Sequence, residues 1–367
     1  MSEWSRTTVG DVITLQRGFD ITKAQQNPGD VPVVSSGGIS SYHDTAMAEG
    51  PGVVMGRKGT LGKVFWLEGG YWPHDTTLWV KDFKGNDRRF VYYFLGTLNY
   101  LSMDVGSSNP TLNRNHVHPT PINWPPLEEQ KGIAAMLGAL DDKIAVNERI
   151  ALTSEELTLN LASPVRWQAR ARVEEVCVLR REQVSPRDVS EELVDHYSLP
   201  AFDAGRTPER VAPEAIRSGK FSVTEPAVLL SKLNPEIPRA WDVTPGSSVP
   251  SLASTEFLVL VPRGTLTSHE LWAVVRQQAF FDDLASRVTG TSKSHQRVRP
   301  AEVMATEIVD PRQFGEAGGQ IRNLCATAAL ARHESQTLAT LRDTLLPQLM
   351  SGRLRVKDAE KIVEDAT

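Results

Sequence analysis

The chain has 367 residues, of which 40% are hydrophobic and 23% are charged, a length and composition typical of a protein with two domains or more. Its net charge of −5 excludes a uniformly basic nucleic-acid-binding protein, so binding to DNA or RNA would need a local basic surface. The sequence has no apolar amino-terminal segment and no run of about 18 apolar residues, so secretion and membrane spanning are not indicated. Cys177 and Cys325 stand far apart in the sequence, which excludes a cysteine-based zinc site. So few cysteines suit a reducing compartment, and we expect a cytoplasmic protein.

One long helix is predicted from Pro125 to Ala162. Glu128 and Glu129 lie in its first turn, where the helix dipole favours negative charge. The first half of its apolar seam consists of Ile133, Leu137, Leu140 and Ile144, spaced by three or four residues. Beyond Asn147 the seam continues in another phase with Ile150, Leu157 and Leu161. The phase change predicts more than one neighbour, and at about 1.5 Å per residue the helix would be roughly 50 Å long.

A second long helix is predicted from Gly318 to Met350. Pro347 and Gly352 are the residues near its end that are expected to stop it. Its apolar seam consists of Ile321, Leu324, Ala328, Ala331, Leu338, Leu341 and Leu345. Each long helix follows a β-rich stretch, and this repeated order predicts an internal duplication.

The β-rich stretches contain the same elements in the same order. In the first, strands are predicted at residues 9–15, 31–35, 52–55, 64–67 and 76–80, and a helix from Arg88 to Tyr100. In the second, the counterparts are strands at residues 173–179, 227–232 and 254–261, and a helix from Ser268 to Val288. We therefore expect an α+β protein with two similar globular domains of mixed β-sheet and helices. Two unrelated α+β domains in tandem are the alternative.

A glycine-rich stretch, GRKGTLGK at residues 56–63, resembles a phosphate-binding loop only superficially. No Gly-Lys-Ser/Thr follows at the required spacing, and no helix is predicted to begin there. A turn between two strands is the better interpretation. It would present Arg57, Lys58, Thr60 and Lys63, and the matching position of the second half holds Ser231 and Lys232. A solvated hairpin tip with incidental charge is the alternative.

Two polar loops follow the predicted helices at equivalent positions. Asn can bond adenine twice, Arg can bond guanine twice, and hydroxyl groups bond phosphate oxygens, so such loops suit DNA. The first loop, residues 106–116, contains Ser107, Ser108, Asn109, Thr111, Asn113, Arg114, Asn115 and His116. The second, residues 290–299, contains Thr291, Ser292, Lys293, Ser294, His295, Gln296, Arg297 and Arg299.

No motif for catalysis, for a cofactor or for a metal is found. His116 and His118 lack an acidic or cysteine partner at ligand spacing. The segment from Asn109 to Leu112 lacks the second proline and the aromatic residue of an amino-methyltransferase motif. No glycine-rich strand–turn–helix suits a nucleotide or a methyl donor, and no hydrolase signature is present. We therefore expect a chain without catalytic, cofactor-binding or metal-binding residues.

Taken together, these residues resemble the specificity (S) subunit of type I restriction–modification enzymes. The resemblance is carried by NPTLNRNHV at residues 109–117, WPPLEEQK at 124–131 and IAAMLGALDDKI at 133–144. It is supported by NERI at 147–150, GRKGTLG at 56–62 and LRDTLLPQLMSG at 341–352. The second half departs from the pattern, because DPRQF at residues 310–314 replaces the proline-rich entry to the helix, whose start is then expected as late as Gln320.

This resemblance implies an organisation for the whole chain. Two target recognition domains are expected, joined by long helices that pair as an antiparallel coiled coil with a pseudo-twofold. The expected limits are 1–124 and 164–314 for the recognition domains, 125–163 and 315–352 for the spacer helices, and 353–367 for a C-terminal tail.

The resemblance also implies partners and leaves catalysis to them. Methyltransferase subunits, two per chain, would dock on the helices, and an endonuclease subunit could join them. S-adenosylmethionine, and ATP with Mg²⁺ if the complex restricts DNA, would be bound by those partners. The two polar loops and the glycine-rich turn are the candidate DNA contacts.

Two unlike recognition domains predict a split, asymmetric double-stranded DNA target, with parts about one to one and a half helical turns apart.

Gly132 and Gly138 in the first long helix are expected to allow close approach of methyltransferase helices, and Leu140→Asp is expected to release that partner or to unfold the spacer. The rival functions are a protein scaffold and a single-chain DNA-modifying enzyme whose active site is not recognised. The sequence does not give the target bases.

Overall fold

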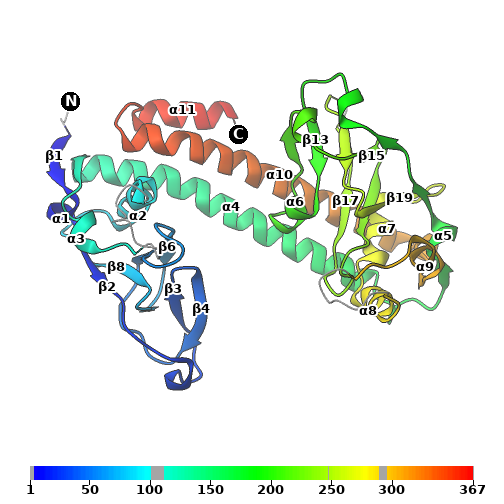
Figure 1. The fold of residues 1–367 in the computed structure, drawn as a ribbon, viewed down its shortest axis with the longest axis horizontal. Helices are drawn as coiled ribbons and strands as arrows, with labels where there is room; N and C mark the ends of the chain where they lie inside the picture. Colours follow the sequence, from blue (N-terminus) through cyan, green and yellow to red (C-terminus); the bar gives the residue numbers. More distant parts are fainter. Residues whose placement is uncertain (1–3, 101–110, 247, 289–295, 367) are drawn as a thin grey trace. The chain divides into compact units, whose positions relative to one another are not determined.

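The computed structural model describes residues 4–100, 111–246, 248–288 and 296–366. It divides into two compact α+β units, the first formed by Met1–Val146 with Glu334–Thr367 and the second by Asn147–His333 (Figure 1). Within the described ranges, each unit contains three β-sheets, one of them two-stranded, and parts of the long helices α4 and α10. Among the described residues, no helix has the length and apolar character that membrane crossing requires.

The main sheet of unit 1 is four-stranded and antiparallel. Its order is β2 (Thr14–Arg17), β8 (Thr77–Asp82), β5 (Gly52–Gly56) and β6 (Val64–Leu67). A smaller sheet has the order β4 (Gly38–His43), β3 (Val31–Ser35) and β7 (Trp72–Pro73), in which β3 and β7 run parallel. Strand β1 (Ser5–Thr8) pairs with β9 (Pro121–Trp124).

Strand β5 lies at the centre of unit 1 because both of its faces are covered. Val53 and Met55 belong to the core that also contains Phe90 of helix α2 (Arg88–Thr97). Val54 points to the other side, into a cluster with Val34 and Tyr71. A run of apolar residues without alternation is the pattern expected for a strand buried on both faces.

The sheets of unit 2 follow the same plan with additional strands. The four-stranded sheet has the order β11 (Cys177–Arg180), β19 (Phe257–Pro262), β16 (Ala227–Ser231) and β17 (Ala240–Val243). The second sheet has the order β12 (Gln183–Val184), β15 (Lys220–Val223), β18 (Ser251–Ala253), β13 (Val194–Tyr197) and β14 (Glu209–Val211). Strand β10 (Arg170–Arg172) pairs with β20 (Glu307–Val309), as β1 pairs with β9 in unit 1.

Short helices also recur at equivalent places. Helices α1 (Val9–Val12) and α5 (Val173–Val176) precede the first strand of each main sheet, and α3 (Arg114–Val117) and α9 (Pro300–Ala305) precede β9 and β20. Helix α2 corresponds to α7 (Ser268–Val275) and α8 (Gln278–Ser286). The remaining short elements are α6 (Leu199–Asp203), η1 (Lys23–Gln25), η3 (Pro186–Asp188), η4 (Pro213–Ala215) and η5 (Pro311–Gln313). The predicted internal repeat is therefore present in the order of elements.

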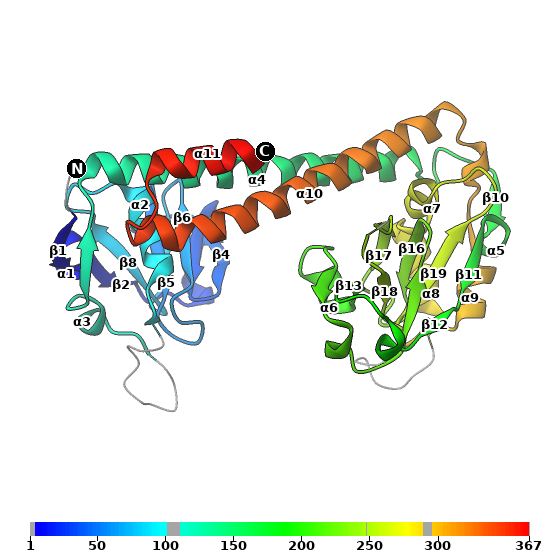
Figure 2. The same cartoon turned by 90° about the horizontal axis from the view of Figure 1, so that it is seen from above.

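The long helices α4 (Leu127–Leu161) and α10 (Glu316–Met350) pack together antiparallel within each unit (Figure 2). In unit 1, Arg342 Nη1 lies 2.6 Å from Asp141 Oδ1, and Lys143 Nζ lies 3.5 Å from Glu334 Oε1. In unit 2, Arg332 Nη2 lies 2.6 Å from Glu155 Oε1, and Thr158 Oγ1 lies 3.9 Å from Cys325 Sγ. Residue numbers rise along α4 as they fall along α10, which establishes the antiparallel direction.

The first half of the predicted seam is buried. Ile133, Leu137 and Leu140 lie in the core of unit 1 with Leu338 and Leu345, while Ile144 and Leu341 are partly buried beside them. The second half of the prediction was wrong for Ile150 and Leu157, which are 39% and 48% exposed, whereas Leu161 is partly buried against the core of unit 2. The buried positions there are Asn147, Ala151, Ser154, Thr158 and Ala162.

Small side chains at the contact between α4 and α10 explain why the buried positions of α4 in unit 2 differ from the predicted ones. Ala151 packs against Ala328 and Ala331, so the helices of unit 2 meet through small side chains that do not form a seam of large apolar residues. Small residues at the contact let helix backbones approach closely.

The glycines of α4 have neighbours within unit 1. A Cβ on Gly138 would lie 2.9 Å from the Arg89 guanidinium carbon, and one on Gly132 would lie 3.5 Å from Val356. Val356 begins helix α11 (Val356–Ala366), which occupies the predicted C-terminal tail and buries Ala359. The close approach expected for partner helices is therefore made by this chain itself. Leu140 is also a core residue, so an aspartate there would disrupt unit 1 rather than a partner contact.

Other boundaries also differ from the predictions. The strands predicted at residues 9–15 and 173–179 are in fact the short helices α1 and α5, each followed by a strand. The helix predicted from Ser268 to Val288 is interrupted between α7 and α8. Helix α10 begins at Glu316 and passes through Pro347 to end at Met350.

Candidate nucleic-acid interface

In unit 1 the glycine-rich turn and the polar loop, which are far apart in sequence, are joined by backbone pairing. The Leu112 amide donates to the Arg57 carbonyl at 2.9 Å. Lys58 and Thr111 form an isolated antiparallel bridge. Leu112 is fully buried and anchors this junction in the core. The end of β5 and the segment that enters α3 therefore form one surface.

Unit 2 contains the same junction. The Val298 amide donates to the Lys232 carbonyl at 3.1 Å, and Leu233 and Arg297 form the corresponding isolated antiparallel bridge. Val298 is buried in the core of this unit. The turn after β16 and the segment entering α9 are thus joined as in unit 1. We call these two places the strand-end surfaces.

Glycine is required in the turn of unit 1. Gly59 and Gly62 have φ angles of 75° and 71°, in the left-handed region that disfavours side chains. A Cβ on Gly62 would lie 2.1 Å from the ring of Tyr100. The tight turn leaves Thr60 and Lys63 exposed, with the Lys63 ammonium 5.4 Å from the Phe65 ring centroid.

Cations outnumber carboxylates at the strand-end surface of unit 1, although Arg17 also pairs with Asp20 at 3.2 Å. Asp75 accepts a hydrogen bond from Arg17 Nη2 at 2.9 Å and lies 4.0 Å from Lys58 Nζ. Arg57 Nη1 donates to the backbone carbonyl of Asp75 at 3.4 Å. Burial opposes ionisation of Asp75, but the Arg17 hydrogen bond and the charges of His74 and Arg17 outweigh it, so its pKa lies below the usual value. The surface is therefore net positive.

The same combination occurs in unit 2. Glu256 accepts hydrogen bonds from Arg297 Nε at 3.1 Å and Nη2 at 2.9 Å. These bonds lower the pKa of Glu256, against the opposing effect of burial and with help from the charge of Lys232. The Lys232 amide donates to the Glu256 carbonyl, as the Arg57 amide donates to that of Thr76. A carboxylate next to the strand-end cations is thus common to both units.

Helix α3 presents a row of exposed polar side chains. The Asn113 side chain caps the helix by accepting from the Asn115 amide at 3.0 Å. Arg114, Asn115 and His116 are exposed, and buried Val117 holds the helix on the core. Within the described part of the chain, Arg114 makes no ion pair.

His118 has a structural role. Its Nε2 accepts a hydrogen bond from the Leu15 amide at 3.0 Å. Burial, with the nearby charges of Arg114 and Lys84, lowers the pKa of His118, which favours the neutral ring that can accept this bond. This contact accounts for His118 without a metal.

Arg299 occupies the place in unit 2 that Asn113 occupies in unit 1. It is the N-cap residue of α9, its amide donates to the Glu302 carboxylate at 3.2 Å, and its side chain is exposed. Gln296 is half-buried, and its carbonyl accepts from the Asn234 amide at 2.8 Å.

The candidate residues divide into three groups. Those brought together at the strand-end surfaces are Arg57, Lys58, Thr60, Lys63, Thr111, Asn113, Arg114, Asn115 and His116 in unit 1, and Lys232, Gln296, Arg297 and Arg299 in unit 2. Ser231 is instead only 1% exposed, and its hydroxyl pairs with the backbone of Leu233, so it shapes the turn. Ser107, Ser108, Asn109, Thr291, Ser292, Lys293, Ser294 and His295 lie outside the described residues.

Arg17, Asp75 and Glu256 were missed. No local motif surrounds them, and a lone charge next to a strand is common. Only the repeat could have indicated Asp75 and Glu256, because Asp75 lies just before β8 and Glu256 just before β19, at equivalent places in the two units.

Residues 1–153 match the model of the type I restriction modification DNA specificity domain. A Haemophilus influenzae protein named as a type I restriction enzyme specificity subunit, S.HindORF215P, is 28% identical over 131 residues, which are 35% of this chain and 32% of that protein. The first 153 residues are thus similar to the DNA specificity domain of type I restriction–modification systems.

A solved structure shows the same fold. The S subunit of a type I restriction–modification system from M. genitalium superposes with a TM-score of 0.63 at 14% identity, over 95% of this chain and 96% of that chain. The aligned part spans about a third of the curated relative, 32% of its length.

Proposed function

We propose that the chain is the specificity (S) subunit of a type I restriction–modification complex and that it recognises double-stranded DNA through the strand-end surfaces of both units. The observation that carries the proposal is the junction repeated in both units, Lys58 with Thr111 and Leu233 with Arg297. Each junction places cations on a rigid strand end and adds polar side chains from the start of a short helix. Phosphate contacts position a protein on DNA, whereas contacts to base edges specify sequence, and these surfaces offer both types of group.

In unit 1, Arg57, Lys58 and Lys63 are the phosphate-binding candidates. Arg114 and Asn115 are the base-reading candidates, since an exposed guanidinium can bond guanine and an amide can bond adenine in the major groove. Thr60, Thr111, Asn113 and His116 would add further polar contacts.

In unit 2, Lys232 and Arg299 are the phosphate candidates, and Gln296 and Arg297 the base-reading candidates. The two sets differ in chemistry, so the two units would recognise different bases. The target is therefore proposed to be bipartite and asymmetric. Residues 1–124 and 164–314 would be the recognition domains, 125–163 and 315–352 the spacer helices, and 353–367 a terminal segment.

The exposed apolar side chains of α4 are the proposed docking place for methyltransferase subunits. Ile150 and Leu157 are seven residues apart and so lie on one face of the helix, next to the contact with α10. Two such subunits are proposed because the chain is an internal repeat, and an endonuclease subunit could join them. S-adenosylmethionine, and ATP with Mg²⁺ for restriction, would be bound by these partners, in the cytoplasm.

Removal of the Glu256 charge tests the role of unit 2. We expect Glu256→Gln to increase the affinity of the assembled complex for duplex DNA by roughly tenfold at low salt, for random and specific sequences alike. The reason is that Arg297 and Lys232 would lose a competing anion. The slope of log affinity against log salt should become steeper by about one. Fluorescence anisotropy over a salt series measures both quantities.

Glu214→Gln is the matched control, because Glu214 is exposed on η4 and makes no ion pair within the described residues. It should leave affinity and salt dependence unchanged. If Glu256→Gln behaved like Glu214→Gln, the strand-end surface of unit 2 would not contact DNA.

A further inference from the structure

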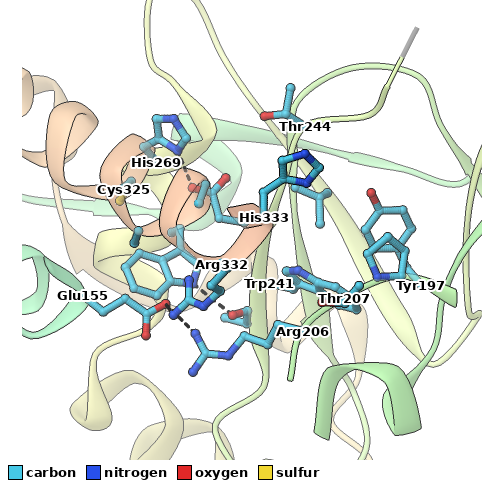
Figure 3. A pocket seen from close by; sticks show the side chains of 17 residues that line it. Glu155, Tyr197, Arg206, Thr207, Trp241, Thr244, His269, Cys325, Arg332 and His333 are labelled. Atoms are coloured by element: carbon cyan, nitrogen blue, oxygen red, sulfur yellow. Dashed lines mark hydrogen bonds and ion pairs between the residues drawn. The ribbon is translucent and has the colours of Figure 1, made fainter. Parts of the chain in front are cut away.

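Unit 2 contains a cavity of about 290 Å³ away from its strand-end surface. Its walls come from β17, α7 and α10, with Glu155 of α4 at one side (Figure 3). Trp241 and Tyr197 contribute aromatic surface, and the Glu155 carboxylate is paired with both Arg206 and Arg332. Nothing in the proposed DNA contacts uses this cavity.

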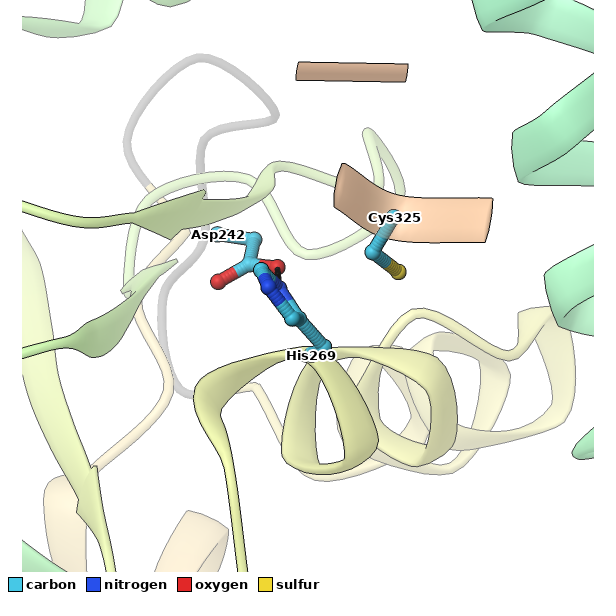
Figure 4. A group of neighbouring side chains, drawn as sticks. All are labelled: Asp242, His269 and Cys325. Carbon is cyan, nitrogen blue, oxygen red and sulfur yellow. Dashed lines mark hydrogen bonds and ion pairs between the residues drawn. The ribbon is translucent and has the colours of Figure 1, made fainter. Parts of the chain in front are cut away.

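Three potential metal ligands meet at its wall. Asp242 comes from β17, His269 from α7 and Cys325 from α10 (Figure 4). One ligand atom of each, a carboxylate oxygen, a ring nitrogen and the thiol sulfur, lies within 4.8 Å of the other two. Asp242 Oδ2 and His269 Nδ1 are in direct hydrogen-bond contact. The fold thus joins residues that are far apart in sequence.

The carboxylate of Asp242 is not fully satisfied by this contact. Its other oxygen, Oδ1, is buried and has no hydrogen-bond partner among the described residues. A buried carboxylate oxygen without a partner is costly, and a cation or a cation-bound water at the cavity wall would satisfy it.

We propose that Asp242, His269 and Cys325 form a binding site for a zinc-like divalent cation. Thiolate, imidazole and carboxylate are the ligand set that Zn²⁺ prefers, and three protein ligands leave one position for water from the cavity. A thiolate and a carboxylate neutralise the two charges of the ion, so the half-buried site is neutral overall.

Coordination replaces a proton on the cysteine. Burial raises the pKa of the Cys325 thiol to about 12, so the sulfur carries a proton when no cation is bound. Binding of the cation displaces that proton, and the proton between His269 and Asp242, to solvent. The separation of Cys177 and Cys325 argues only against a site that both cysteines share, whereas here Cys325 is one of three ligands that the fold alone brings together.

The site has a structural consequence within unit 2. Cys325 lies on the segment of α10 that contacts Thr158 of α4, whereas Asp242 and His269 belong to the sheet and to the helix that covers it. A bound cation would therefore tie the long helices of this unit to its recognition sheet. We expect it to raise the melting temperature of the full chain.

Cobalt provides a direct test, since a Co²⁺–thiolate bond gives a charge-transfer absorption band. The full-length chain, stripped of metal by chelator and titrated with Co²⁺, should bind about one equivalent with this band, and Zn²⁺ should displace it. Cys325→Ser should abolish the band, and His269→Gln should weaken binding at least about tenfold. Cys177→Ser is the matched control, because Cys177 is also buried but donates to the Val173 carbonyl in another part of the unit.

The proposal is supported if the band is present in wild type and in Cys177→Ser and lost in Cys325→Ser. Circular dichroism checks that each variant is folded. If His269→Gln does not fold, Asp242→Asn, a variant of the third ligand, takes its place. Absence of the band in the wild-type chain, or its persistence in Cys325→Ser, would overturn it.

Discussion

Replacing Leu137 by aspartate is expected to unfold unit 1. Leu137 is 0% exposed and lies in the core that unites α4, α10 and helix α2 of unit 1. An unpaired buried charge costs at least about 3–5 kcal/mol, against a total stability of about 5–15 kcal/mol for an ordinary domain. Thermal unfolding followed by circular dichroism should show loss of the cooperative transition, or a fall in its midpoint by more than about 10 °C.

Leu157→Asp is the informative comparison, because the same chemical change is made on the same helix at a side chain that is 48% exposed. This variant should keep the wild-type melting temperature and lose co-purification with the methyltransferase subunits. Ala145→Asp adds the same charge at another exposed position of α4 and should retain the partner. Docking through the exposed face would be refuted by normal co-purification of a folded Leu157→Asp chain.

Removal of three cations from unit 1 is the second change with a large expected effect. In the triple variant Arg57→Ala, Lys58→Ala, Arg114→Ala, the assembled complex should bind its target roughly 100- to 1,000-fold more weakly at physiological salt. Arg57 and Lys58 are the phosphate candidates among the three, and each lost phosphate contact removes a released counterion, so the salt slope should fall by about two. Binding isotherms at several salt concentrations measure both effects.

The control removes Arg353, Lys357 and Lys361, which are exposed cations in and before α11 of the same unit. It changes the net charge equally and should change affinity little. Equal losses in the two triple variants would indicate that only the overall charge of unit 1 matters and would exclude a specific strand-end surface.

The long helices could be predicted where large apolar residues mark the buried face. Ile133, Leu137 and Leu140 have no competing pattern nearby, so the spacing identifies their face correctly. In unit 2, Ala151, Ser154 and Thr158 form the contact, whereas the larger Ile150 and Leu157 stay exposed. Apolar periodicity fails there because the helices pack through small side chains, and the larger ones remain available for the proposed partner.

The strand errors had one cause in both units. Val9 and Val12, like Val173 and Val176, are buried apolar residues that read as strand but lie on one face of a single helical turn. Four residues are too few to distinguish the two periodicities. The same misassignment at equivalent positions is a consequence of the repeat itself.

The candidate DNA contacts could be proposed from residue type, but their assembly could not. Lys58 and Thr111 are far apart in sequence, and only backbone pairing across the sheet end brings them together. The burial of Ser231 depends on a turn whose hydrogen bonds are tertiary details. Asp75 and Glu256, which balance the cations, carry no pattern that distinguishes them from other surface acids.

The central claim, that the two units read different parts of one target, is tested most directly by exchanging one of them. Residues 164–314 are replaced by the corresponding residues of another S subunit, and methylated bases are mapped across a genome in cells that also make the methyltransferase partner. We predict that one part of the bipartite methylated sequence changes and the other is retained. A change in both parts, or in neither, would contradict the account.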